Sequence, residues 1–521
     1  MASTSALALT LAGLLFSQSA HAANIIWDGN LNSNNSGDWG TTAGNELNWG
    51  GDVNPGTGDV AQLLDVTTGT RTVTLQNATT VQALTMTQTT SGAVNQLTLN
   101  AGLTLTNQTA LSLTPAVGEP QSLVVNLNGQ TITMSNSTNF GTTTHTLNGT
   151  WNFNGAGSSL IATGTGNQQT HNFNVENTLN VSANATIGRD NGGTGGGNNL
   201  ANDVNFNFGT ASDVNVTSGT LTLIKRFRSD TNGSDLLVNN SGAFDIASGA
   251  SVQLRRDNLS AGGTTQATTF TNNSTGVVTL GGTLDFFRAG TGTVVNSVVN
   301  SGTFIVNGAD AFVNRSGGNT VAFTNNSTGT LRGNSANDTL DYDNLLTSTR
   351  MTITSSGVVS AGAGHNGTGL ASVGTLSLQD IDLTFTGVDS RLRLDIGGTG
   401  AAQFDVLSLI AGDNITAGLL TLDSVNTKLD LYYVNGFVPT SGFSINILNY
   451  GSVSGTFDLA NNLSIFGATG LGASAANYSI AYGANTATLT LIPEPSTYAL
   501  LGIGLGALFI LRRVRHTGTK S

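Results

Sequence analysis

The sequence predicts an all-β protein: a right-handed parallel β-helix, or β-solenoid, followed by a C-terminal β module and a terminal transmembrane helix. Apolar and polar residues alternate with period two along most of the chain, which marks strands with one buried face. A glycine-cornered unit recurs through the middle of the chain. Charged residues make up only 9 %, against about 25 % in an average soluble protein. This composition argues against a protein built from helices with charged, exposed faces.

The recurring unit begins with Ser or Thr, followed by glycine, any residue and an apolar residue. Its glycines are Gly219, Gly242, Gly276, Gly302, Gly329 and Gly357, at steps of roughly 23 to 34 residues. Each unit holds a strand, a glycine corner, a second strand and a loop, which is typical of a parallel β-helix whose coils stack on one another. A β-sandwich array is the alternative, because alternation alone does not distinguish parallel from antiparallel pairing.

The N-terminal residues predict a secretory signal peptide over residues 1–22. An apolar run from Ala6 to Phe16 leads to an A-x-A cleavage site that ends at Ala22. No lysine or arginine precedes the run, so we expect the natural start codon to lie upstream.

Three further segments follow the signal peptide. Residues 23–60 contain Trp27, Trp39 and Trp49 and predict an N-terminal cap, because the open end of a solenoid would otherwise recruit other chains. Residues 61–370 hold the solenoid repeats. Residues 371–492 are predicted to form the C-terminal β module.

The tail, residues 493–521, has three parts in a fixed order. Pro493, Glu494 and Pro495 come first, an uncharged apolar stretch from Tyr498 to Leu511 comes second, and an arginine cluster ends the tail at Arg512, Arg513 and Arg515. Arginines directly after an apolar helix anchor a membrane helix on its cytoplasmic side. The tail therefore predicts a transmembrane helix, with the body exported.

These three parts resemble the PEP-CTERM sorting signal. The resemblance implies that an exosortase-type transpeptidase recognises the tail, after the secretion machinery has exported the body. It further implies a precursor held in the inner membrane, whose body is then released to the cell surface or extracellular matrix.

The body resembles the β-helical passenger of autotransporter-type surface proteins. The likeness rests on Trp27-Asp-Gly and Asn48-Trp49 near the start, and on residues 392–399, 404–409 and 453–457 near the end. Those proteins usually end in a membrane β-barrel, whereas this chain ends in the tail, so self-translocation is not implied.

Charge and cysteine content exclude several classes of protein. The 18 basic residues are outnumbered by 30 acidic ones, and the net charge of −12 argues against nucleic acid as a partner. The chain has no cysteine, which excludes disulfides and thiolate metal sites.

The sequence predicts no catalytic, cofactor-binding or metal-binding residues, and hence no enzyme. His145, His171 and His365 show no paired ligand spacing. A calcium site is one interpretation of an acidic cluster, and ordinary turn formation is the other. The cluster consists of Asn337, Asp338, Asp341, Asp343 and Asn344.

A charge ladder is the sharpest prediction from the repeats. Its arginines are Arg228, Arg255, Arg288 and Arg315, accompanied by Asp230, Asp257, Asp285 and Asp310. We expect the arginines on one side of the solenoid, in successive coils, close to the aspartates. One interpretation is a solvated ion ladder, in which exposed pairs add only ~0–1 kcal/mol each. The other is a stripe for an anionic polysaccharide, with Phe227, Phe287 and Phe312 as stacking platforms.

These observations predict an exported, non-enzymatic structural protein of the cell surface or extracellular matrix. The alternative is a glycan-binding, adhesin-like module with extracellular polysaccharide as its partner. Two further hypotheses are a polysaccharide-active β-helix enzyme, which would need paired carboxylates, and an ice-binding protein, since Thr-x-Thr pairs occur at residues 85–87 and 104–106.

Overall fold

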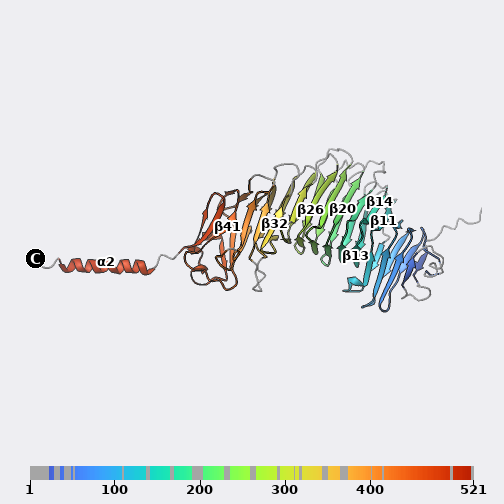
Figure 1. The fold of residues 1–521 in the computed structure, drawn as a ribbon, viewed down its shortest axis with the longest axis horizontal. Coiled ribbons are helices and arrows are strands. Elements are labelled where there is room, and N and C mark those ends of the chain that lie inside the picture. Colours follow the sequence, from blue (N-terminus) through green and yellow to red (C-terminus); the bar gives the residue numbers. More distant parts are fainter. Residues whose placement is uncertain are drawn as a thin grey trace, which may run out of the picture. The chain divides into compact units, whose positions relative to one another are not determined.

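A computed structural model gives the fold of the chain (Figure 1). The residues it describes are 23–27, 36–39, 49–50, 53–107, 111–136, 141–164, 169–190, 203–227, 235–258, 266–289, 294–309, 311–315, 320–342, 350–363, 373–400, 402–412, 416–492 and 497–517. They form two compact units, one of Met1–Phe206 with Leu221–Asp230 and the other of Asn207–Thr220 with Thr231–Ser521. We call them the first and second units.

In the first unit, strands that are neighbours in a sheet are usually three apart in the chain. One series is β2 (Gly37–Trp39), β4 (Thr70–Leu75), β7 (Val94–Leu99), β10 (Leu123–Asn126), β13 (Thr150–Phe153) and β16 (Thr178–Val181). A second is β5 (Thr79–Val81), β8 (Leu103–Leu105), β11 (Thr131–Asn136), β14 (Ser158–Gly164), β17 (Ala185–Asp190) and β20 (Thr220–Phe227). The others are β1 (Asn24–Ile26), β3 (Val60–Leu63), β6 (Ala83–Thr87) and β9 (Leu111–Thr114), then β12 (Gly141–Leu147) and β15 (Gln169–Val175).

The second unit repeats this arrangement. Its first series is β19 (Asp213–Val216), β22 (Ala243–Ile246), β25 (Val277–Leu280), β28 (Thr303–Val306), β31 (Thr330–Arg332), β34 (Val358–Ser360), β37 (Arg391–Ile396), β40 (Lys428–Tyr433) and β43 (Leu463–Phe466). The second is β23 (Ser251–Asn258), β26 (Thr283–Ala289), β29 (Ala311–Arg315), β32 (Asn337–Asp341), β35 (Thr375–Gln379), β38 (Val406–Ile410), β41 (Ser444–Asn449), β45 (Thr486–Leu491) and β44 (Tyr478–Tyr482). The third is β21 (Leu236–Asn240), β24 (Gln266–Asn272), β27 (Val294–Asn300), β30 (Val321–Asn325), β33 (Met351–Ser355), β36 (Ile381–Phe385), β39 (Leu419–Thr421) and β42 (Ser452–Ser454).

The parallel β-solenoid is confirmed. Stacked strands of successive coils pair in parallel, as β24 does with β27 from Gln266↔Val294 to Asn272↔Asn300. Along β24, buried and half-buried residues alternate, so Phe270 faces the core and Thr271 faces outward. The sandwich alternative is wrong, because a strand's neighbour is the strand one coil away in the chain rather than a hairpin partner. Antiparallel pairing of named strands occurs in the described residues at the C-terminal end, where β45 pairs with β41 and β44.

A buried ladder of asparagines runs through the second unit. The Nδ2 of Asn240 donates to the Oδ1 of Asn272 at 2.9 Å, and Asn272 donates in the same way to Asn300 at 2.8 Å. The ladder continues to Asn325 at 2.8 Å and ends on the Ser355 hydroxyl at 3.0 Å. Each amide thus satisfies the one on the next coil, which lets polar groups remain inside the core.

The ladder and the close stacking of coils explain the recurring glycines. A Cβ on Gly276 would lie 2.2 Å from the Oδ1 of Asn272, and one on Gly302 would lie 2.2 Å from the carbonyl oxygens of Asn273 and Gly276. A side chain at Gly276 would therefore collide with the ladder amide of Asn272, and one at Gly302 would collide with the backbone of the preceding coil. The repeat signature found in the sequence marks this contact.

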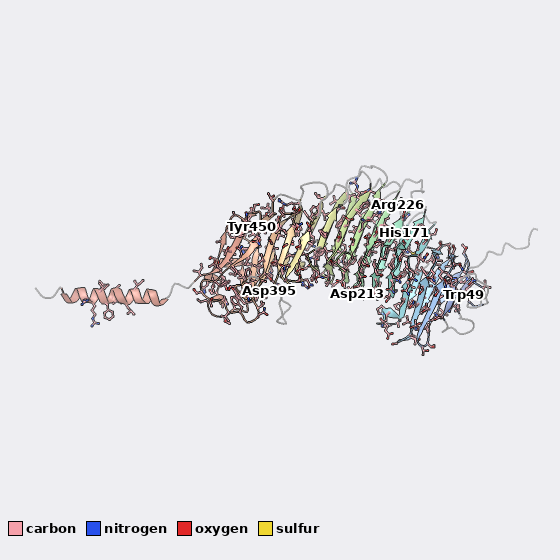
Figure 2. All side chains as sticks on the ribbon, in the orientation of Figure 1. Trp49, His171, Asp213, Arg226, Asp395 and Tyr450 are labelled. Atoms are coloured by element: carbon pink, nitrogen blue, oxygen red, sulfur yellow. The ribbon has the colours of Figure 1, made fainter. Side chains whose placement is uncertain are left out.

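Tryptophans and tyrosines are buried near the two ends of the chain. Trp27, Trp39 and Trp49 are buried, and the Trp49 ring lies 5.2 Å from Trp27 and 5.0 Å from Trp39 (Trp49 is labelled in Figure 2). Toward the other end, the hydroxyls of Tyr433 and Tyr478 lie 2.7 Å apart. Such packing is what a cap requires, although the segment boundaries predicted at residues 60 and 370 stay predictions.

The described helices are four short ones, η2 (Pro120–Ser122), α1 (Leu459–Asn462), η3 (Gly470–Ala473) and η4 (Ala475–Asn477), and the 21-residue α2 (Thr497–Thr517) in the tail. The strands on either side of residue 370 pair in the same manner as those before them, since β32 pairs in parallel with β35. The described part of the C-terminal module therefore continues the solenoid up to β41.

Candidate functional site

The tail forms a helix where the sequence predicts one. Helix α2 covers Thr497–Thr517 and includes the whole apolar stretch. Arg512 and Arg513 are exposed on it, and Arg515 lies on its last turn. Pro493, Glu494 and Pro495 lie outside the described residues. Among the helices of the described residues, none combines the length and apolarity that a membrane crossing requires.

The register of the predicted charge ladder is wrong. Arg255, Arg288 and Arg315 do lie on three consecutive strands of one sheet, β23, β26 and β29. However, Arg255 is beside Phe287, and Arg288 is beside Arg256. Arg315 is beside Phe286.

The predicted register fails because successive side chains of a strand point to opposite faces. A shift of one residue therefore moves a side chain to the other face. Arg255 is half-buried on the outer face, whereas Arg256 is fully buried. Paired residues of β23 and β26 are 32 positions apart, one fewer than the separation of Arg255 and Arg288, so these two arginines lie on opposite faces. Arg228 lies outside the described residues, as do Asp230 and Asp310.

Arg255 nevertheless has the acidic neighbour that the sequence suggests. Its Nε lies 3.0 Å from both carboxylate oxygens of Asp257, two residues along the same strand. Its guanidinium carbon lies 4.8 Å from the centre of the Phe287 ring. Asp285 accepts a hydrogen bond from Gln253 instead, at 2.9 Å. The local pair neutralises Arg255, which favours the ion-pair interpretation over an anionic-polysaccharide stripe.

The acidic cluster around residue 340 is divided between the two faces of β32. Asp338 is buried, and its carboxylate accepts hydrogen bonds from the backbone N–H groups of Gly308, Asn334 and Ser335 at 2.6–2.7 Å. Asp341 is half-buried and accepts from Gln379 at 2.8 Å. In the described part of the chain no three His, Asp or Glu side chains lie together as metal ligands would. Asp343 and Asn344 lie outside it.

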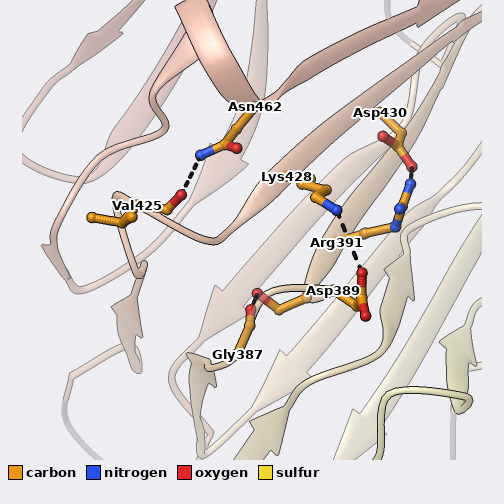
Figure 3. A network of polar contacts seen from close by, with 8 residues as sticks. Gly387, Asp389, Arg391, Val425, Lys428, Asp430 and Asn462 are labelled. Atoms are coloured by element: carbon orange, nitrogen blue, oxygen red, sulfur yellow. Dashed lines mark hydrogen bonds and ion pairs between the residues drawn. The ribbon is translucent and has the colours of Figure 1, made fainter.

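A second group of charges, which the sequence analysis did not single out, lies on β37 and β40 (Figure 3). Arg391 and Lys428 are in register. Arg391 donates to Asp430 at 3.2 Å, and the Lys428 ammonium lies 3.4 Å from Asp389. The Lys428–Asp389 pair is partly exposed and contributes ~0–1 kcal/mol. The Asp430 carboxylate is buried, so Arg391 compensates a charge that lies inside the protein. In the sequence, these four residues stood out only because charged residues are rare in this chain.

Two histidines meet inside the first unit although their spacing gave no sign of it. His145 on β12 and His171 on β15 are buried, and the Nε2 of His145 lies 3.2 Å from the Nδ1 of His171. The two residues are 26 apart, close to one coil of the solenoid. Burial, with the Arg189 charge as the second cause, lowers the pKa of His145 to about 4 and the pKa of His171 to about 2.

We expect this histidine pair to make the first unit sensitive to acid. The unfolded chain takes up protons at histidine near pH 6.5, whereas the folded chain does so only near pH 4 or below. The free energy of unfolding therefore falls as the pH drops through that window, by ~3 kcal/mol from His145 alone. Urea unfolding at pH 7, 5.5 and 4.5 measures this. The His145→Phe variant should show a flatter pH profile than the wild type; equal profiles would contradict the assignment.

Comparison with known proteins identifies the tail alone. Residues 491–515 match the PEP-CTERM protein-sorting motif. No curated protein and no solved structure matches the chain. The motif implies recognition by an exosortase and an exported, membrane-anchored precursor. This chain is therefore an exported protein with a parallel β-solenoid body and a C-terminal PEP-CTERM sorting motif.

Proposed function

We propose that the mature protein is a non-enzymatic structural component of the cell surface or extracellular matrix. The observation that carries the proposal is the junction of body and tail. Strand β45 ends at Leu491, and the sorting motif begins at the same residue. The solenoid is thus complete where the sorting signal starts, so the tail can be removed without cutting a strand.

The regularity of the body supports a structural role. Stacked coils present long surfaces of repeated side chains, and their stability is approximately the sum of contacts between neighbouring coils. On the outer face of the first unit, Asn126, Asn152 and Asn180 are linked by amide hydrogen bonds of 2.7 and 2.9 Å. Such polar rows keep the exposed face hydrated, which suits a protein that remains outside the cell.

Removal of the tail is the test of the sorting step. The full chain should fractionate with membranes, and deletion of residues 498–521 should release the body into the soluble fraction. The expected change is nearly complete, because an apolar segment followed by Arg512 and Arg513 is removed. Fractionation with a carbonate wash and immunoblotting measures it, with Arg255→Ala as a control that should stay with the membrane. A truncated body that still pellets after the wash would contradict anchoring of the precursor by its tail.

A second experiment tests whether the transpeptidase recognises the proline-containing motif. Replacing Pro493 and Pro495 together by alanine leaves the apolar stretch and the arginines in place. We therefore expect this variant to reach the membrane but to accumulate there as an unprocessed precursor. Wild-type processing of the variant would show that this motif is not what the exosortase recognises.

A further inference from the structure

A cleft of about 270 Å³ lies on the second unit beside β32, β35, β38 and β41. Its walls include Asn337, Thr375, Phe404, Val406, Asn446 and Asn449. The volume is near the lower end for small-molecule sites, roughly 300 Å³. A cleft of this volume has room for one sugar ring but not for several sugar units of a polymer.

The lining has the chemistry of a site for an uncharged, polyhydroxylated molecule. None of the residues that line this cleft is charged. The amides of Asn337, Asn446 and Asn449 and the hydroxyl of Thr375 can each donate and accept hydrogen bonds. Phe404 and Val406 add an apolar surface. A neutral sugar presents the same two features, hydroxyl groups around its edge and a face of C–H groups.

Phe404 is held in place by a short hairpin that follows β37. Phe404 forms an antiparallel bridge with Ile396, and the N–H of Gly397 donates to the carbonyl oxygen of Gln403 at 2.7 Å. Ala402, also on the wall, has φ +61°, a left-handed conformation that is strained for a residue with a side chain. The hairpin thus maintains local strain next to the cleft, as binding sites often do.

A buried carboxyl group next to Phe404 in the chain holds the segments around the cleft together. Asp405 is fully buried, and its Oδ1 accepts a hydrogen bond from the N–H of Gly374 at 2.7 Å. Its Oδ2 accepts from the N–H groups of Gly362 at 3.1 Å and Asp395 at 2.9 Å. Asp405, the residue after Phe404, therefore ties together three chain segments, one of which continues into Thr375. The cleft is formed in advance rather than on binding, which lowers the entropy cost of capturing a ligand.

We propose that this cleft binds one neutral sugar unit of a glycan, with Phe404 as the apolar contact and the asparagine amides as hydrogen-bonding partners. This activity goes beyond the structural role and does not depend on it. It also differs from the arginine stripe considered from the sequence, because the lining carries no charge to attract a uronate.

The test is binding of the full chain to an array of neutral gluco-, galacto- and manno-oligosaccharides together with uronate oligosaccharides. The strongest neutral ligand is then titrated by calorimetry. We expect saturable binding, weakened about tenfold by Phe404→Ala and roughly three- to tenfold by Asn446→Ala. Asn446 is exposed, so its variant should fold even where Phe404→Ala does not. Phe287→Ala, which removes an outer-face phenylalanine of the same unit, is the matched control and should bind like the wild type.

Four results would overturn the proposal, and the first three concern the ligand and Asn446. They are an array with no neutral ligand, binding restricted to uronates, and binding that Asn446→Ala leaves unchanged. A loss of binding in Phe287→Ala equal to that in Phe404→Ala would place the sugar elsewhere and overturn it as well. None of these outcomes affects the membrane fractionation of the tail variants, so this proposal and the structural one fail independently.

Discussion

Asn272→Ala is expected to destabilise the second unit by about 3 kcal/mol or more. The Asn272 side chain is fully buried, accepts from Asn240 and donates to Asn300. Alanine would leave the donor of Asn240 and the acceptor of Asn300 inside the core without this partner. Each buried polar group left without a partner costs roughly 1–3 kcal/mol.

Asn239→Ala is the matched control for the ladder. Asn239 precedes Asn240 on β21, faces outward and donates to Asn207 at 2.9 Å. Water can replace that bond, so we expect a loss of about 1 kcal/mol or less. Urea unfolding followed by circular dichroism compares the variants, and limited proteolysis shows whether the coils near β24 open first. Equal losses in the two variants would mean that the ladder does not stabilise the core.

Gly302→Ala is expected to have a still larger effect, up to failure of the second unit to fold. The added Cβ would lie 2.2 Å from two carbonyl oxygens, those of Asn273 and Gly276, and 2.9 Å from the Nδ2 of Asn272. Backbone atoms of the preceding coil cannot move aside without breaking β25–β28 pairing. Overpacking a tight interior typically costs 1–3 kcal/mol, and a contact with backbone is at the upper end or beyond.

Gly58→Ala controls for the substitution itself. A Cβ at Gly58 would meet no atom within 4 Å. Alanine there should be neutral or slightly stabilising, because it reduces the conformational freedom of the unfolded chain. Soluble yield and thermal unfolding distinguish the two glycines. Wild-type stability in Gly302→Ala would show that the coils at this corner are separated more widely than the structure has them.

The sequence predicted the solenoid because its signals are local and repeated. Alternation along β24 and the glycine at each corner are visible within one sequence repeat, and the recurrence of that repeat implies stacked coils. The tail was predictable for a similar reason. Pro493 to Arg515 form a contiguous motif, whose recognition needs no partner from elsewhere in the chain.

The register between coils and the partners of buried polar groups could not be predicted from such local patterns. Gly276 could be recognised as part of the repeat signature, whereas its contact with the Asn272 amide could not. Arg255 was aligned with Arg288, although Arg256 is the residue beside it. The sequence repeat does not give the pairing register between strands, and a shift of one residue reverses which side chain enters the core.

The sequence by itself therefore determined the class of fold, the period of its coils and the sorting signal, since each depends on residues adjacent in the chain. Only the tertiary structure decided which side chains meet across coils. It placed His145 against His171, and it placed Asp405 behind Phe404 at the uncharged cleft. The physical reason is that contacts between coils join residues about 25 to 40 positions apart, and loops of variable length change that separation from coil to coil.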